Sequence, residues 1–421
     1  MRPLRESRDF RLVTIGALVT GVGNQAALVA LPYQVFVLTG SPFLTGLLGL
    51  VELLPHIVAS LYAGALADRF SRRSMLLAIQ ILQVAVSAVL AVVAFTHVDA
   101  VWALYVLAAF VAGTNGMEWV VRIAVVPTTV PPRLLRSALS LTYGLVTLTM
   151  VIGPAIGGLL IAWLGVGSAY TVDAVTCLAM AGAAWLMSPL RPVGMTEHES
   201  VWASIRDGLG FVRRTKPVMG GFVIDLAAMT FGMPRALFPV LSLEVYHAGA
   251  AGTGFLFAAV SAGATVAALT AGWLNRARYL GRIVLVAVAG WGVTIALAGL
   301  VHSIWPALVL FGLAGAADSI SAICRNTISQ SLTPDKLRGR MSSVYSTVVA
   351  GGPRLGDLEA GAVGSIASPG FAVVSGGVAC IASVGLVALF FPQLASYDGA
   401  RYAPTDFTAE FEASEIEAQS L

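Results

Sequence analysis

The sequence has 421 residues and a formal net charge of +3; 57% of its residues are hydrophobic and 11% are charged. Soluble domains carry about 25% charged residues, so this composition excludes a soluble globular protein, and the small net charge gives no reason to expect a nucleic-acid partner. Cys177, Cys324 and Cys380 lie in apolar stretches without metal-ligand spacing, so we expect no metal and no cofactor.

Twelve apolar stretches follow one another along the chain. Each is long enough to cross a bilayer as a helix, which takes about 20 residues. They cover residues 12–38, 42–67, 74–96, 101–128, 137–164, 168–189, 218–245, 253–274, 282–301, 304–330, 341–367 and 370–392. The sequence therefore predicts an all-α integral membrane protein with twelve transmembrane helices.

Basic residues collect on one side of these stretches. Six of the loops between the stretches, among them 39–41 and 97–100, contain no Lys or Arg. The loops on the opposite side, together with the two ends of the chain, hold twenty-one of the twenty-five basic residues. Joints rich in Lys and Arg stay in the cytoplasm. We therefore expect a multi-pass protein of the cytoplasmic (inner) membrane with both termini in the cytoplasm.

The two sets of six stretches repeat each other. Residues 132–140 match residues 334–342, and Gly153-Pro154 matches Gly352-Pro353. Parallel six-helix repeats are one architecture of secondary transporters, with the substrate site at the repeat interface. We expect a first six-helix half, a cytoplasmic linker, a second six-helix half and an acidic, disordered cytoplasmic tail, at 1–189, 190–217, 218–392 and 393–421.

The linker contains one apolar stripe at helical spacing, formed by Trp202, Ile205, Leu209 and Val212. This pattern predicts an amphipathic helix that lies on the inner surface of the membrane. A linker without such a helix is the alternative.

The stretch 64–73, which reads GALADRFSRR, joins the second and third apolar stretches. It resembles the signature of the major facilitator superfamily, G-x-L-x-D-R-x-G-R-R, except that Ser71 replaces the second glycine. The matching residues include Gly64, Asp68, Arg69, Arg72 and Arg73. The resemblance implies a conformational switch in which Asp68 caps a neighbouring helix and latches the outward-facing state. The alternative is a loop that only anchors the chain.

Two further patterns narrow the resemblance. The fifth stretch has Gly153, Pro154, Gly157 and Gly158, which resembles the Gly-Pro signature of drug/proton antiporters. The residues around 205–212 and 326–340 are similar to the enterobactin-exporter-like branch, which includes siderophore exporters and multidrug efflux proteins. The outer half of the fourth stretch lacks the arginine usual in such antiporters, because Arg122 lies nearer the cytoplasmic end.

Charged residues within the apolar stretches are candidates for function, because burying them is costly unless they are paired. They are Glu52, Glu118, Arg122, Asp225, Arg235, Asp318, Arg325, Arg354, Asp357 and Glu359. Glu118–Arg122, Asp318–Arg325 and Arg354–Asp357 have helical spacing that also fits structural ion pairs.

Three of these carboxylates, Glu52, Asp225 and Glu359, have no partner at helical spacing. An unpaired buried carboxylate can take up and release a proton near neutral pH, so these three are candidates for proton coupling. Asp173, near the outer end of its stretch, is expected at the solvated rim.

No nucleotide-binding P-loop and no catalytic constellation is found, so we expect no enzymatic activity. The predicted function is a monomeric secondary transporter that exports an amphiphilic small molecule, siderophore- or drug-like, by proton antiport. An importer of the same fold and a membrane sensor or assembly partner that does not transport remain alternatives.

Overall fold

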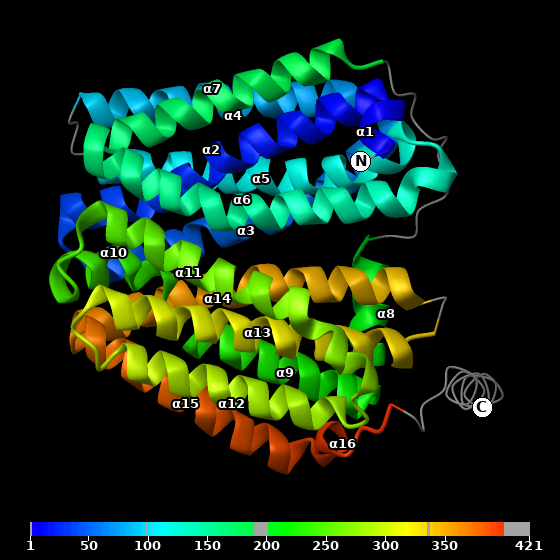
Figure 1. Ribbon diagram of the computed structural model, residues 1–421, viewed down its shortest axis with the longest axis vertical. Coiled ribbons are helices and arrows are strands. Elements are labelled where there is room, and N and C mark those ends of the chain that lie inside the picture. The colour runs from blue at the N-terminus through cyan, green and yellow to red at the C-terminus, as the bar shows by residue number, and fades with distance from the viewer. Residues whose placement is uncertain (1, 97–99, 189–200, 335–336, 400–421) are drawn as a thin grey trace.

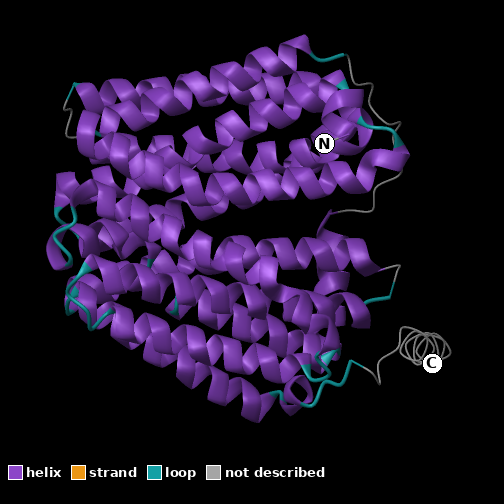
Figure 2. Ribbon diagram, in the orientation of Figure 1, coloured by secondary structure: helices purple, strands orange, loops and turns teal. Residues whose placement is uncertain are grey.

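The computed structural model describes residues 2–96, 100–188, 201–334 and 337–399. Within these residues every regular element is a helix (Figure 2). The first half contains α1 (Arg2–Glu6), α2 (Arg8–Thr39), α3 (Pro42–Arg69), α4 (Arg72–Phe95), α5 (Val101–Thr129), η1 (Pro132–Leu134), α6 (Leu135–Leu164) and α7 (Val166–Leu186).

After α8 (Val201–Arg214), the second half forms a similar bundle. It contains α9 (Lys216–Phe231), η2 (Arg235–Leu237), α10 (Phe238–Val240), η3 (Leu241–Val245), α11 (Gly249–Thr270), η4 (Ala271–Arg276), α12 (Leu280–Ala298), α13 (Ile304–Leu332), α14 (Arg338–Ile366), α15 (Pro369–Phe390) and α16 (Pro392–Ala395). The two halves lie one above the other in Figure 1.

Eleven helical segments among the described residues are long and apolar enough to cross a membrane. The remaining expected span is α14, a 29-residue helix. Its apolar character is reduced by Arg354, Asp357 and Glu359, yet it packs lengthwise against α3 and α9. The structure therefore has the predicted arrangement of twelve long helical segments in two halves.

The seventh expected span is broken, where the sequence predicted one continuous helix. Its first part, α9, ends before Gly232, and Pro234 and Pro239 then interrupt the regular hydrogen bonds. The free carbonyl oxygen of Gly232 accepts a hydrogen bond from Trp291 Nε1 at 2.9 Å. Such breaks are tolerated within a membrane where neighbouring groups satisfy the freed backbone.

The halves contact each other through α3 with α14 and through α6 with α11. We call the end of the bundle with α1 and α16 the terminal end, and the end with α10 the distal end (Figure 1). The contacts are tightest toward the distal end: a Cβ added to Gly46 would lie 3.0 Å from Gly361 Cα, and one added to Gly158 would lie 2.8 Å from Gly254 Cα. Phe43 N also donates to Ser365 Oγ at 2.7 Å.

Toward the terminal end the halves diverge. Gly144 lies on the same helix as Gly158 but nearer its N-terminal end, and a Cβ added there would meet nothing within 4 Å. An open pocket here is lined by Arg136, Ser140 and Gly144 of α6, and Tyr143 is 56% exposed. The structure is therefore closed at its distal end and open at its terminal end.

The linker helix and the start of the tail pack against the second half. Helix α8 contacts α9 and α14 and buries Phe211 and Val212, so its last turn packs against the second half. The predicted disordered tail begins with an ordered part: Leu394 and Tyr397 are buried, and Tyr397 OH lies 2.6 Å from Ser331 Oγ. Residues 400–421 lie outside the described part.

Asp398 joins this ordered part to the loop before α12 through an ion pair with Arg278. Its Oδ2 atom lies 2.7 Å from Arg278 Nη2, and this hydrogen-bonded carboxylate raises the pKa of the guanidinium. Gly399 N donates to the carbonyl oxygen of Arg278 at 3.1 Å. Residues 394–399 are therefore anchored to the second half at the terminal end.

Candidate functional site

Four charged side chains gather where α3 of the first half meets α14 of the second. Glu52 Oε2 lies 4.0 Å from Arg354 Nε, which makes an ion pair between the halves. Arg235 interacts electrostatically with both Glu52 and Asp357. We call Glu52, Arg235, Arg354 and Asp357 the interface quartet; it holds two acids and two bases.

The broken seventh span positions one side of this quartet. Because the backbone is interrupted before η2, Ala236 N is free to donate to Asp357 Oδ1, at 2.9 Å. Arg354 Nη1 donates to its own helix at Ala350 O, at 2.8 Å, and its Nε is turned to Glu52. The sequence offered Asp357 as a partner for Arg354, but the ion pair that the structure records joins Arg354 to the other half.

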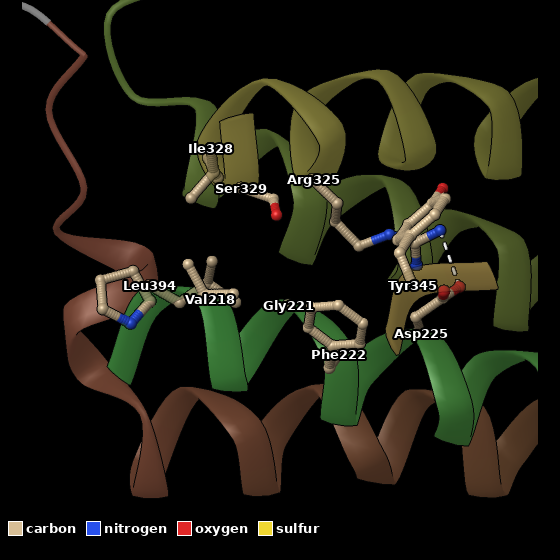
Figure 3. Close-up of a pocket in the computed structure, with 10 residues that line it drawn as sticks. Val218, Gly221, Phe222, Asp225, Arg325, Ile328, Ser329, Tyr345 and Leu394 are labelled. Atoms are coloured by element: carbon tan, nitrogen blue, oxygen red, sulfur yellow. Dashed lines mark ion pairs between the residues drawn. The ribbon is translucent and has the colours of Figure 1, made fainter. Parts of the chain in front are cut away.

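A second cluster lies inside the second half (Figure 3). Arg325 Nη2 of α13 is 2.7 Å from Asp225 Oδ1 of α9. The same atom is 3.8 Å from Asp318 Oδ1 on its own helix. Arg325 and Asp225 are both buried, and Arg325 Nε and Nη1 have no hydrogen-bond acceptor among the described residues. Asp225, which lacks a partner at helical spacing, therefore has one on another helix.

This cluster borders a small pocket. Phe222 and Tyr345 meet edge to face beside the Asp225–Arg325 pair, with ring centroids 6.1 Å apart. Asn326 Nδ2 donates to Tyr345 OH at 3.2 Å, and Leu394 of α16 also lines the pocket. Glu359, the third candidate without a partner at helical spacing, is half-buried on α14 and makes no ion pair within the described residues.

A third cluster lies inside the first half. Arg122 Nη1 and Glu118 Oε1 pair at 3.4 Å along α5, as their spacing predicted. Gln83 Nε2 of α4 donates to Asn115 Oδ1 at 2.8 Å and to Glu118 Oε2 at 3.3 Å. Glu118 is therefore held from two helices.

Asp173 is not at a solvated rim, where the sequence placed it. Its side chain on α7 is buried with a residue exposure of 3%, and Ser87 Oγ donates to Asp173 Oδ2 at 2.5 Å. Sequence reasoning missed Gln83 and Ser87 because neither is charged. The signal was present, since both lie with Gln80 on one face of a largely apolar stretch.

The switch motif sits at the terminal end, between α3 and α4. Ser71, the departure from the signature, is the N-cap of α4 and accepts from Ser74 N. Arg72 Nη1 donates to Ala124 O at 3.0 Å, and Arg73 donates to Ala184 O and Trp185 O at 3.2 and 2.5 Å. These arginines therefore bind carbonyl oxygens near the ends of α5 and α7. The side chains of Asp68 and Arg69 lie outside the described part, and a Cβ added to Gly64 would meet nothing within 4 Å.

The Gly-Pro motif forms two helix contacts. Gly153 and Gly157 face Gln25 and Ala26 of α2, whereas Gly158 faces Gly254 of α11. Pro154 lies within α6 without ending it. The motif therefore brings α6 against a helix of each half.

Two pseudo-symmetric bundles that meet through glycines, with a balanced charge cluster across the contact, define a transporter of the major facilitator type. Residues 1–420 match the family described as "Transmembrane secretion effector", and the chain belongs to this family.

Relatives and solved structures agree with this class. The enterobactin exporter EntS of Shigella boydii serotype 4 (strain Sb227) is 27% identical over 417 residues, which covers 96% of each chain. EntS of Escherichia coli (strain SMS-3-5 / SECEC) is 26% identical over the same length.

Among solved structures, a POT family transporter in complex with 5-aminolevulinic acid superimposes with a TM-score of 0.71 at 12% identity, covering 92% of this chain and 97% of its own. A bacterial homologue of the iron transporter ferroportin, in an inward-facing state, gives a TM-score of 0.68 at 17% identity, with coverages of 92% and 99%. At these identities the likeness concerns the fold.

Proposed function

We propose that this protein is a secondary active transporter that exports an amphiphilic, siderophore-like small molecule by proton antiport. The relatives named enterobactin exporters support the substrate class and the direction. The fold supports transport by alternating access, in which two halves move about a central site. One chain supplies both halves and the interface quartet, so we propose that a monomer in the lipid bilayer is sufficient.

The distribution of basic residues supports the orientation. With twenty-one of the twenty-five on the joints and ends of one side, the terminal end faces the cytoplasm. A bundle closed at its distal end then faces inward. Residues 1–189 and 218–392 are the proposed moving halves, and the switch motif with Asp68 is proposed to act when they close on the cytoplasmic side.

The observation that carries proton coupling is the ion pair between Glu52 and Arg354, since it joins the two halves. Proton binding to Glu52 removes its charge and with it the attraction to Arg354. Protonation and the contact between α3 and α14 are therefore linked, because each changes the free energy of the other. Asp225 and Glu359 are the further proton-coupling candidates.

Transport into inside-out membrane vesicles tests the proposal. Vesicles from cells that lack their own exporters receive an acidic interior, and uptake of enterobactin, a macrolide and a fluorescent dye is measured. We expect gradient-dependent uptake that a protonophore abolishes, and loss of the gradient dependence in Glu52→Gln. Glu244→Gln, an exposed glutamate of η3, is the matched control. No gradient-dependent uptake of any probe, or accumulation only in right-side-out vesicles, would overturn the proposal.

A further inference from the structure

Asp173 is a buried carboxyl group that the proposed mechanism does not use. It lies on α7, which packs against α2 and α4. The approach of α2 is close, because a Cβ added to Gly23 would lie 2.9 Å from Asp173 Cα. With an exposed fraction of 3%, the side chain has almost no contact with solvent.

The hydrogen-bond partners of Asp173 are uncharged. Ser87 Oγ of α4 lies 2.5 Å from Oδ2, and Cys177 Sγ, one turn along α7, lies 3.7 Å from Oδ1. Cys177 Sγ also lies 3.9 Å from Asn24 Oδ1 of α2 and from Gln83 Oε1 of α4. Hydroxyl, thiol and amide groups therefore surround one carboxyl.

The titratable groups near Asp173 supply no counter-charge. On α7 they are Cys177 and Tyr170, whose hydroxyl donates to Gln34 Oε1 at 2.9 Å. On α5 the neighbour is Glu118, which carries the same sign and is paired with Arg122. The polar groups that α2 and α4 contribute are amides and a hydroxyl, and within the described residues no ion pair reaches Asp173.

The protonation state of Asp173 follows from this environment. An ionised carboxylate buried without a cation costs several kcal/mol, and a second carboxylate nearby adds to that cost. A protonated carboxyl avoids this cost and keeps the hydrogen bond that Oδ2 accepts from Ser87 Oγ.

We infer that Asp173 is a second proton-binding site, buried in the first half and separate from the interface quartet, which holds one proton in the distal-closed conformation. When the proton leaves to water, a carboxylate remains, and Ser87 and Cys177 then serve as its donors. Asn24 of α2 and Asn115 of α5 are half-buried and belong to the same group of contacting side chains, through Cys177 and Gln83. The role of the site in transport rests on the proposed function, but its occupancy does not.

Infrared difference spectroscopy of the purified full-length protein in lipid nanodiscs tests the occupancy without any substrate. At neutral pH we expect a carbonyl band of a protonated carboxylic acid that shifts in heavy water. The band should be lost in Asp173→Asn and shifted in frequency in Ser87→Ala, because the acid loses a hydrogen-bond partner. Glu244→Gln, on the exposed surface, should leave it unchanged.

The outcomes separate the site from the proposed function. A spectrum unaltered by both Asp173→Asn and Ser87→Ala would overturn the inference, even if the vesicles transport. If Asp173→Asn fails to fold, the frequency shift in Ser87→Ala decides alone. In vesicles that transport, Asp173→Asn should lose uptake driven by the pH gradient but retain substrate exchange at equal pH, whereas loss of both would reduce Asp173 to a structural residue.

Discussion

Arg325 Nη2 and Asp225 Oδ1 lie 2.7 Å apart and join α13 to α9 inside the second half. The guanidinium also faces Asp318 at 3.8 Å, so one cation serves two carboxylates. Removal of one partner from a buried pair leaves an uncompensated charge and costs about 3–5 kcal/mol. The cluster is therefore sensitive to the loss of Arg325 above all.

Arg325→Gln should strongly lower the thermal stability of the protein. The substitution leaves Asp225 and Asp318 without their shared cation, whereas Asp318→Asn removes the more distant, partly exposed acid and should have a small effect. Scanning fluorimetry in detergent measures both. The double variant Asp225→Asn/Arg325→Gln should recover part of the loss, and a double variant no more stable than Arg325→Gln would show that the pair is not the cause.

Gly158→Ala should destabilise the distal contact between the halves. The added methyl group would lie 2.8 Å from Gly254 Cα, which is backbone and cannot turn aside, and overpacking of this kind costs about 1–3 kcal/mol. Gly144→Ala, on the same helix with nothing within 4 Å, is the matched control and should be neutral or slightly stabilising. Equal melting temperatures for the two variants would contradict a tight contact.

Arg73→Ala should loosen the terminal end of α7. The side chain donates to Ala184 O and Trp185 O, and hydrogen bonds to charged groups contribute about 1.5–3 kcal/mol. Arg73→Lys should retain only part of this stabilisation, because an ammonium group lacks the planar, forked arrangement of donors of a guanidinium. Arg133→Ala removes an exposed pair with Glu6 and should change the melting temperature little. A similar loss in both alanine variants would argue against a specific role of Arg73.

Asp68→Asn should impair conformational switching while the topology of the chain is kept. The expectation follows from the signature at 64–73, since the amide retains the size of the side chain but loses its charge. Vesicle uptake measures switching, and maleimide labelling of single cysteines placed in the loops measures topology. Normal uptake would reduce the motif to an anchor.

Leu394→Ala should destabilise the second half, because Leu394 is fully buried and truncations of this kind cost about 2–5 kcal/mol. Tyr397→Phe removes the contact with Ser331 Oγ and should cost about 0.5–1.5 kcal/mol. Ser396→Ala, on an exposed side chain between them, is the control. If truncation of Leu394 left the melting curve unchanged, the segment would not be an anchor.

The helices could be predicted from the sequence because each span needs an unbroken apolar stretch, and the observed helices follow the expected order. The broken seventh span was missed, although Pro234 and Pro239 were visible. Proline is common in membrane helices, and Pro154 leaves α6 uninterrupted. Whether a proline ends a helix depends on partners such as Trp291, which only the fold supplies.

Pairs within one helix could also be predicted, and Glu118–Arg122 is an example. Pairs between helices could not, because helical spacing says nothing about which helices become neighbours. Asp225 and Glu52 both gained arginine partners in this way. Asp173 was misplaced for a related reason: its depth follows from α4 and α2 packing around it, not from its distance to a predicted loop.

The two ends of α6 differ in how freely their residues can be substituted. On α6, the part around Gly158 is confined by the backbone of its partner, whereas Ser137, Ser140 and Gly144 border open space. Side chains at Gly158 can therefore hardly vary without spreading the halves, but side chains at the open end can. Variants with altered substrate specificity, among relatives or from directed evolution, are therefore best sought around Ser137, Ser140 and Gly144. New side chains there extend into open space and do not disturb the packing of the helices.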